Sequence, residues 1–409
     1  MKKPDILSLT GEKDAQTRDF FSRRKFFRYS AMSVAGIALA PRLSSQEKAT
    51  DERPKQPLQA DIRTNIDEVR RVPRVAGSMP GKYPGQVVKV DTGTAFAAGN
   101  LDGSKVRTAL NRGLSELTGE KDMRAAWRQF VSPSDTVGIK VNPIGEKILS
   151  TKPEVVEAII EGLLAAGVAK ANIVIWDRRH FQLAEAGFTP GRFPGIRILG
   201  TETKGPNGDF WDPKGELWSK DNIDREALPY VAEAEQKYDR ETMPYMINEG
   251  KHSYFTRLVT SICTKIINVP ILKNAGPTVT CCLKNLSYGS LSNTGRLHAL
   301  WMKSVAEPCA FPCLRDRVVL NIADGLQSCY DGGPGANPKF IYDANVMLFG
   351  TDPVAVDAVA HDFIIKERTA RKIQQLEGKK QSEFLYIAEG LGLGVAAREK
   401  IKVRDISLG

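Results

Sequence analysis

Short apolar runs and one strongly periodic segment alternate in the middle of the chain. Residues 136–141 (TVGIKV) and 172–176 (NIVIW) are too short for buried helices and are predicted to be buried strands. Between them, residues 153–167 carry apolar side chains at helical spacing, with a proline in the first turn and a glycine at the end. Strand, helix and strand at this spacing predict a βαβ unit with parallel strands.

Further apolar runs continue this pattern towards the C-terminus. A helix is expected to begin at Asp352, where Pro353 occupies the first helical position. Strands are expected at residues 87–90, 265–269, 318–322, 346–350 and 401–403. These elements predict an α/β fold, a Rossmann-like layered arrangement with a mostly parallel sheet.

Composition divides the chain into parts. Residues 1–45 have the features of an export signal, and residues 46–85, rich in Pro, Gln, Arg and Lys, are predicted to be a linker or arm. Residues 86–409 are predicted to be a single α/β domain. Within it, residues 200–252 are polar and aromatic, and we expect an insertion or lid over the core.

The leader predicts a location. Arg23 and Arg24 precede a short apolar run at residues 29–40, which is typical of a signal for the twin-arginine translocation machinery. The run has twelve residues, fewer than the roughly 20 that a membrane span needs. We therefore expect the protein in the periplasm or on the outer face of the cytoplasmic membrane, with no span beyond the leader. Cleavage of the leader and its retention both stay open.

Half of the net charge belongs to this leader. The whole chain carries +10, with 58 Lys and Arg against 48 Asp and Glu. Residues 1–45 hold nine of the basic residues and four of the acidic ones. The remaining basicity is modest and spread out, and no basic run is interleaved with aromatic residues. Nucleic acid is therefore not an expected partner.

The six cysteines all lie between Cys263 and Cys329. In an exported protein they predict disulfides or buried free thiols, with Cys309 and Cys313 as the spaced pair. A metal or iron–sulfur site is the alternative. It ranks lower, because no CxxC occurs and the usual four-cysteine spacing is missing.

Three lysines, each followed closely by an asparagine, are predicted to lie at or just beyond strand ends. The pairs are Lys140 with Asn142, Lys273 with Asn274, and Lys284 with Asn285. Ligands of open α/β sheets bind outside the carboxyl ends of the strands. Lysines that converge there would bind a small anion such as a phosphate or carboxylate. The alternative is three separate surface lysines.

Acidic residues form a second candidate set. Asp324 follows an apolar strand and Asp357 lies near the start of the next helix, and their oxygens suit a divalent cation. For Asp352 we favour a helix N-cap, because Asp before Pro is a preferred start. Gly335 belongs to a Gly-rich segment whose backbone can approach a ligand closely.

His298 is the histidine best placed for general acid–base chemistry, since it follows the Lys284 segment closely. Together with Asp324 and Lys284 it completes the candidate catalytic set. The sequence contains no HExxH, GxSxG or P-loop, so the commonest zinc protease, serine hydrolase and NTPase designs are not expected.

The order of these motifs resembles one known family, called domain of unknown function 362, over roughly residues 135–395. The resemblance rests on GIKVNP, TKPEVVEAIIEGLLAAGV, NIVIWDR, IINVPILKN, TVTCCLKNLSYG, NIADGLQSCYDGGPGANP and FGTDPVAVDAVAHDFI. Some members carry a fused ferredoxin-type module, which these 409 residues do not contain. The resemblance implies one site lined by Lys140, Asn142, Lys273, Lys284, Asn285, His298, Asp324, Gly335, Asp352 and Asp357.

Three functions remain open at this level. The first is an exported protein that binds a small anionic ligand at the Lys, Asn, Asp and His site, with a divalent metal as a candidate cofactor. The second is a redox protein, or a maturation factor for one, that uses the cysteines from Cys263 to Cys329. The third is a non-catalytic envelope scaffold. No residue identifies itself as a nucleophile, so the sequence assigns no reaction.

Overall fold

A computed structural model describes residues 62–97, 99–234, 251–275, 278–333, 337–373 and 382–409. The predicted leader, with Arg23 and Arg24, and Gly335 lie outside these residues. The strands are β1 Gln86–Asp91, β2 Phe96–Ala97, β3 Asn100–Leu101, β4 Val137–Lys140, β5 Ile173–Arg179, β6 Arg197–Glu202, β7 Tyr230–Val231, β8 His252–Ser253, β9 Lys265–Asn268, β10 Ile271–Ala275, β11 Thr278–Thr280, β12 Val318–Cys329, β13 Ile341–Tyr342, β14 Val346–Gly350 and β15 Lys402–Ser407.

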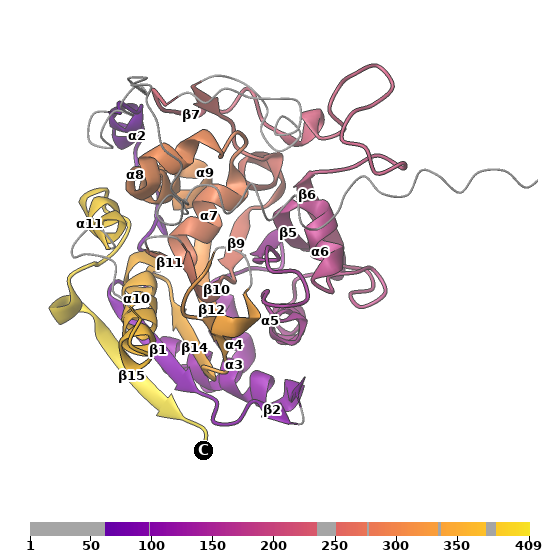
Figure 1. Cartoon of the computed structure of the whole chain (residues 1–409). Coiled ribbons are helices and arrows are strands. Elements are labelled where there is room, and N and C mark those ends of the chain that lie inside the picture. Colours follow the sequence, from indigo (N-terminus) through magenta and orange to yellow (C-terminus); the bar gives the residue numbers. More distant parts are fainter. Residues whose placement is uncertain (1–61, 98, 235–250, 276–277, 334–336, 374–381) are drawn as a thin grey trace, which may run out of the picture. The chain divides into compact units, whose positions relative to one another are not determined.

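Helices cover both faces of the main sheet (Figure 1). They are α2 Ile66–Arg70, α3 Gly103–Thr118, α4 Met123–Arg128, α5 Pro153–Ala165, α6 His180–Glu185, α7 Cys282–Ser290, α8 Trp301–Ala306, α9 Pro312–Arg315, α10 Pro353–Ala370 and α11 Glu383–Gly390.

Eleven strands of the described part join in one mixed sheet, whose main path runs β15-β1-β14-β12-β9-β4-β5-β6. The half from β12 to β6 is parallel throughout. Strand β14 runs antiparallel to both of its neighbours, β1 and β12. The predicted α/β fold with a mostly parallel sheet is confirmed, and the parallel half is the part that carries the lysine-bearing strand β4.

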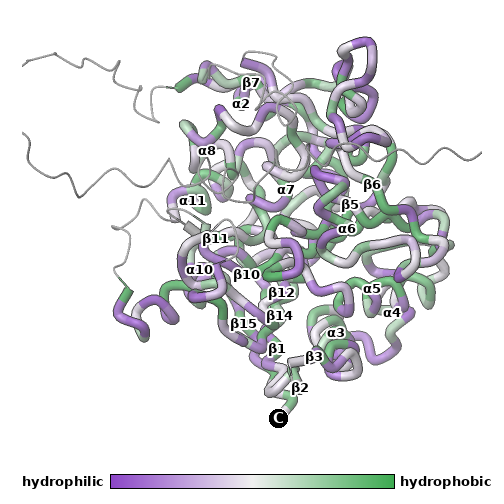
Figure 2. Tube along the Cα trace, turned by 45° about the vertical axis from the view of Figure 1, so that its right-hand side comes forward, coloured by the Kyte–Doolittle hydropathy of each residue, from purple (hydrophilic) through white to green (hydrophobic). Residues whose placement is uncertain are grey.

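Two hydrophobic cores lie on opposite faces of this sheet, and the period of two along each strand decides which residue enters which core. In β5, Ile173 and Ile175 face the helices α3, α4 and α5, whereas Val174 and Trp176 face the core of α7, α8, α10 and α11. The edge strand β15 is mostly hydrophilic, with Val403 and Ile406 as its apolar residues (Figure 2). The result is a three-layer arrangement with the sheet in the middle.

Most predicted elements lie where the apolar pattern placed them. The helix predicted at residues 153–167 is α5, and the strand predicted at 346–350 is β14. The strand predicted at 318–322 continues to Cys329. Lys284, expected at or just beyond a strand end, lies in the first turn of α7, which begins shortly after β11 ends. The short run CCLKNL allows a strand or a helix, and periodicity alone cannot decide between them.

The described parts of the arm and of the insertion contact each other. Asn65, just before α2, donates from its backbone to the Val231 carbonyl at 3.1 Å. Strand β7 pairs with β8, so residues on both sides of 235–250 meet in a two-stranded ribbon. Within the described ranges, no helix is long and apolar enough to cross a membrane.

Candidate functional site

Three polar side chains stand in a row across the parallel strands β4, β9 and β12. Lys140 of β4 is in register with Asn268 of β9, which is in register with Asn321 of β12. Each alternates with apolar residues of the α3–α5 core, Ile139 and Ile267 among them. Because alternate residues point to opposite faces, all three polar side chains face α7. The sequence pattern therefore builds a buried polar row directly under one helix.

Helix α7 approaches this row closely because one of its residues has no side chain. A Cβ atom on Gly289 would collide with Cε and Nζ of Lys140. The Lys140 ammonium group donates to Asp177 of β5, to the Val141 carbonyl at 2.8 Å and to Asn285 Oδ1 at 3.0 Å. Lys140 is therefore a buried cation with a complete set of partners. Burial lowers its pKa, and the Asp177 carboxylate opposes that shift.

Asparagine side chains extend this contact into a chain of hydrogen bonds. Asn142 Nδ2 donates to Asn285 Oδ1 at 3.1 Å, and Asn285 Nδ2 donates to Asn268 Oδ1 at 2.8 Å. Asn268 Nδ2 then donates to Asn321 Oδ1 at 2.9 Å. Every amide in the chain both accepts and donates, so these buried polar groups are satisfied and hold α7 in place over the strand ends.

Lys273 of β10 enters the same chain from its other end. Its ammonium group donates to Asn142 Oδ1 at 3.2 Å, and the side chain is fully buried. An amide oxygen is neutral, so this contact satisfies one N–H bond without compensating the charge. Burial lowers the pKa of Lys273 to about 8, and the nearby Lys140 lowers it as well.

Lys284 differs from both. Its side chain lies on α7 and is only 7% exposed, and within the described residues its Nζ has no hydrogen-bond partner. The Nζ lies 3.9 Å from the ring centroid of Trp301 and 5.4 Å from that of Tyr288. Burial lowers the pKa of Lys284 to about 7, and the charge of Lys273 adds to this effect. Lys284 is thus a buried amine enclosed by aromatic rings.

His298 belongs to the same aromatic group but reaches solvent. Its ring centroid lies 5.3 Å from that of Tyr288 and 5.3 Å from that of Trp301. Its Nδ1 is 2.9 Å from the carbonyl oxygen of Gly295. A carbonyl only accepts, so Nδ1 carries the hydrogen and Nε2 is left as an acceptor. Burial of part of the ring and the charge of Lys284 lower the pKa of His298 to about 4.

The three candidate carboxylates have a different role, because each meets the start of a helix. Asp324 accepts from the backbone N–H of Lys152, just before α5, at 2.7 Å, and from Leu326 at 3.1 Å. Asp352 caps α10 as predicted, accepting from Val354 at 3.0 Å and from Ala355 at 2.9 Å. Both side chains are fully buried.

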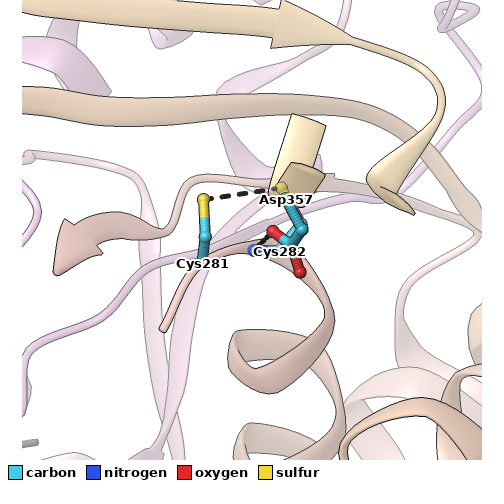
Figure 3. A group of neighbouring side chains, drawn as sticks. All are labelled: Cys281, Cys282 and Asp357. Carbon is cyan, nitrogen blue, oxygen red and sulfur yellow. Dashed lines mark hydrogen bonds between the residues drawn. The ribbon is translucent and has the colours of Figure 1, made fainter. Parts of the chain in front are cut away.

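Asp357 lies on α10 but caps α7. One of its oxygens accepts from the backbone N–H of Cys282 at 2.5 Å (Figure 3), and the other accepts from that of Leu283 at 2.9 Å. Burial raises its pKa to about 6, against these hydrogen bonds. The Sγ atoms of Cys281 and Cys282 lie 3.9 Å apart beside it. This is the one trio of His, Cys, Asp or Glu side chains close enough for a single ion that the described residues contain.

The trio does not include Asp324, so the structure places Asp324 and Asp357 at two different helix starts rather than in one such group. The divalent metal expected at these two carboxylates stays a prediction. We interpret the Cys281, Cys282 and Asp357 contacts as the packed cap of α7.

None of the six cysteines, all of them described, forms a disulfide. Of the two alternatives predicted for Cys309 and Cys313, the structure therefore has free thiols and not a disulfide. Cys309 is buried with its Sγ directed at the Leu283 carbonyl at 3.5 Å, and burial raises its pKa well above the usual value. The pKa of Cys313 is raised to about 12 in the same way. Such thiols pack as small apolar groups.

The predicted set therefore divides into two. Lys140, Asn142, Lys273, Lys284 and Asn285 share one continuous buried neighbourhood, with His298 at its outer edge. Asp324, Asp352 and Asp357 hold helix starts around it.

Sequence reasoning missed several members of the neighbourhood. Asp177, Asn268 and Asn321 directly follow apolar residues in NIVIWD, KIIN and VVLN, and a polar residue in that position was an available signal. Tyr288 and Trp301 gave no such signal, because aromatic residues near a helix are ordinary core residues.

Comparison with known protein families assigns the chain to one of them. The model described as Domain of unknown function (DUF362) matches residues 137–362, more than half of the chain. The chain belongs to this family, as the motif order suggested. The matched range contains every residue of the buried neighbourhood, from Lys140 on β4 to Asn321 on β12.

Other comparisons add little. No curated protein matches the sequence. A crystal structure of a protein from Thermotoga maritima is similar with a TM-score of 0.32 and 9% sequence identity. The alignment covers 68% of this chain and 60% of the other, so it spans less than two thirds of that protein's length.

Proposed function

We propose that this protein binds a small anion beside Lys273 and Lys284, beneath the rings of Tyr288, Trp301 and His298. The observation that carries the proposal is a surplus of buried cationic side chains. In the described part of the chain, the three buried lysines have one ion-pair partner, the buried carboxylate of Asp177, and it bonds Lys140. A buried charge without a partner is costly, and an anionic ligand would compensate it.

Unused hydrogen-bond donors support the same proposal. Trp301 Nε1 and Thr280 Oγ1 are buried without a partner among the described residues, as Lys284 Nζ is. Thr280 lies directly opposite Lys273 in the β10–β11 ladder, so the two side chains share one face. Ammonium, hydroxyl and indole N–H groups all donate to oxyanions. These donors match an oxyanion better than a cation or an apolar ligand.

Binding measurements on matched lysine variants test the proposal. Inorganic phosphate, sulfate, oxalate and pyruvate serve as probes in thermal-shift experiments. We expect at least one of them to raise the Tm of the wild type, and K284M and K273M to weaken its binding about tenfold or more.

The control is K265M, at the opposite end of β9, which should bind like the wild type. If no probe binds, or if K265M weakens binding equally, the proposal is wrong. An outcome in which K284M also changes nothing would favour the scaffold alternative.

Export is a second part of the proposal. It is supported by Arg23, Arg24 and the apolar run at residues 29–40, all outside the described residues. Cell fractionation of the full chain tests it: the protein is expected in the periplasm or on the outer face of the membrane. Replacing both arginines with lysine should retain the chain in the cytoplasm, and an unchanged distribution would contradict the twin-arginine route.

The cofactor proposals stand apart from the anion site. A divalent metal at Asp324 and Asp357 has the support of their oxygen donors, and elemental analysis of the purified protein tests it. For the redox alternative, the described structure offers weak support, because burial raises the pKa of all six thiols and reactive cysteines need a lowered pKa.

A further inference from the structure

Lys284 has the surroundings of a reactive amine rather than those of an ion-pair partner. Lys140 bonds a carboxylate and Lys273 bonds an amide, whereas Lys284 Nζ meets only aromatic rings in the part of the chain that the structure describes. Lysines are activated as nucleophiles by desolvation and by a neighbouring cation. Lys284 has both, since it is buried and Lys273 lies close enough to act on it electrostatically.

The amine is also near the surface. Tyr288 and Trp301, whose rings enclose it, are half-buried, and His298 beyond them is exposed. The described side chains that enclose Nζ are thus themselves partly exposed.

We propose that Lys284 forms an imine with the carbonyl carbon of a small 2-oxo carboxylate, whose carboxylate group binds beside Lys273. The inference rests on the proposed anion site and names its substrate class. Among the described residues, Asn142 Oδ1 takes one of the three N–H bonds of Lys273, and the others can serve this carboxylate. Thr280, opposite Lys273 on the same face, adds a hydroxyl donor.

The step balances without an external oxidant or reductant. The neutral amine of Lys284 attacks the carbonyl carbon, and a C–N bond forms while the carbonyl π bond opens to a hydroxyl group. The hydroxyl group takes one of the two amine hydrogens, and its loss together with the remaining N–H hydrogen gives the C=N bond and one water molecule. The unprotonated Nε2 of His298 is suited to accept the proton from the attacking nitrogen and to return it to the departing hydroxyl. The lowered pKa of Lys284 supplies free amine near neutral pH.

Reductive trapping tests this inference on the full chain. The protein is incubated with pyruvate and cyanoborohydride near pH 7, and peptide mapping locates the reduced adduct. We expect Lys284 to be modified on the order of a hundredfold faster than an exposed lysine, because far more of it is unprotonated. K284R should lose the adduct, and K265R should keep it.

Lactate is the matched ligand control, since it carries the same carboxylate but no carbonyl. If pyruvate and lactate stabilise the protein equally and no adduct forms at Lys284, the imine is wrong and anion binding survives. Adducts spread evenly over exposed lysines would also overturn the imine. If neither compound binds and nothing is trapped, both this inference and pyruvate as a ligand of the anion site fail, while phosphate and sulfate binding still decide the site itself.

Discussion

A lysine ammonium group that is buried on folding loses its hydrogen bonds to water, and the protein replaces them to different degrees for the three buried lysines. Lys140 gains a carboxylate, Asp177, with a carbonyl and an amide beside it. Lys273 gains an amide oxygen, and Lys284 gains only the faces of aromatic rings. A cation over an indole ring recovers part of the lost hydration but less than an anion does. The binding proposal depends on this difference, because the charges of Lys273 and Lys284 are less compensated than that of Lys140.

The lowered pKa of Lys284 predicts how the stability of the free protein depends on pH. Its pKa is about 7 in the folded state and 10.5 as the ordinary value, so above pH 7 the unfolded chain binds more protons than the folded one. The free energy of unfolding must therefore rise with pH in this window. We expect urea unfolding to show that K284M removes about 2 kcal/mol of the rise between pH 7 and 9.

Lys265→Met is the control for this measurement, because Lys265 lies at the start of β9, away from the buried row, and its profile should parallel the wild type. A K284M profile that rises as steeply as the wild type would show that Lys284 is not held in a proton-poor state by burial.

At the scale of elements, α7 is the part of the site that local sequence could not predict. Its N-terminus is capped by Asp357, which is 75 residues further along the chain, so no capping signal precedes Cys282. Strands β4, β9 and β12 were predictable because their apolar runs are local. All three lysines were expected at or just beyond strand ends. Lys140 ends β4, Lys273 lies within β10, a strand that was not predicted, and Lys284 lies in the first turn of α7.

Contact between α7 and the sheet depends on Gly289. A methyl group there collides with Lys140, which has no room to move because its Nζ is held by Asp177 and Asn285. We expect G289A to reduce the free energy of unfolding by about 1–3 kcal/mol and to weaken anion binding. Chemical denaturation measures the first effect and thermal shift the second.

Gly390, at the end of α11, supplies the comparison: nothing lies near its missing Cβ, so G390A should be neutral or stabilise by up to about 1 kcal/mol. Equal effects of the two substitutions would contradict the close packing of α7 on Lys140.

In the whole molecule, sheet order brings together residues that are far apart in sequence. Lys140, Asn268 and Asn321 come from β4, β9 and β12, which are neighbours in the sheet although other elements separate them along the chain. The class of fold and the site's place at strand ends followed from apolar periodicity and from the rule for open α/β sheets. Which side chains bond each other within the site depends on strand order, and no local sequence pattern encodes strand order. The hydrogen bonds of Asp177 and of the linked asparagines could therefore be found only from the structure.

The central claim is that buried lysines without a carboxylate partner bind an anion. Isothermal titration calorimetry at pH 8, in two buffers of different ionisation enthalpy, tests it most directly. The titrant is the probe anion that stabilises the wild type best. An anion beside Lys273 and Lys284, whose pKa values are about 8 and about 7, must raise both, so binding should take up roughly one proton per anion. The double variant K273M/K284M should show neither binding nor uptake. Binding that releases protons, or that is unchanged in the double variant, would contradict the account.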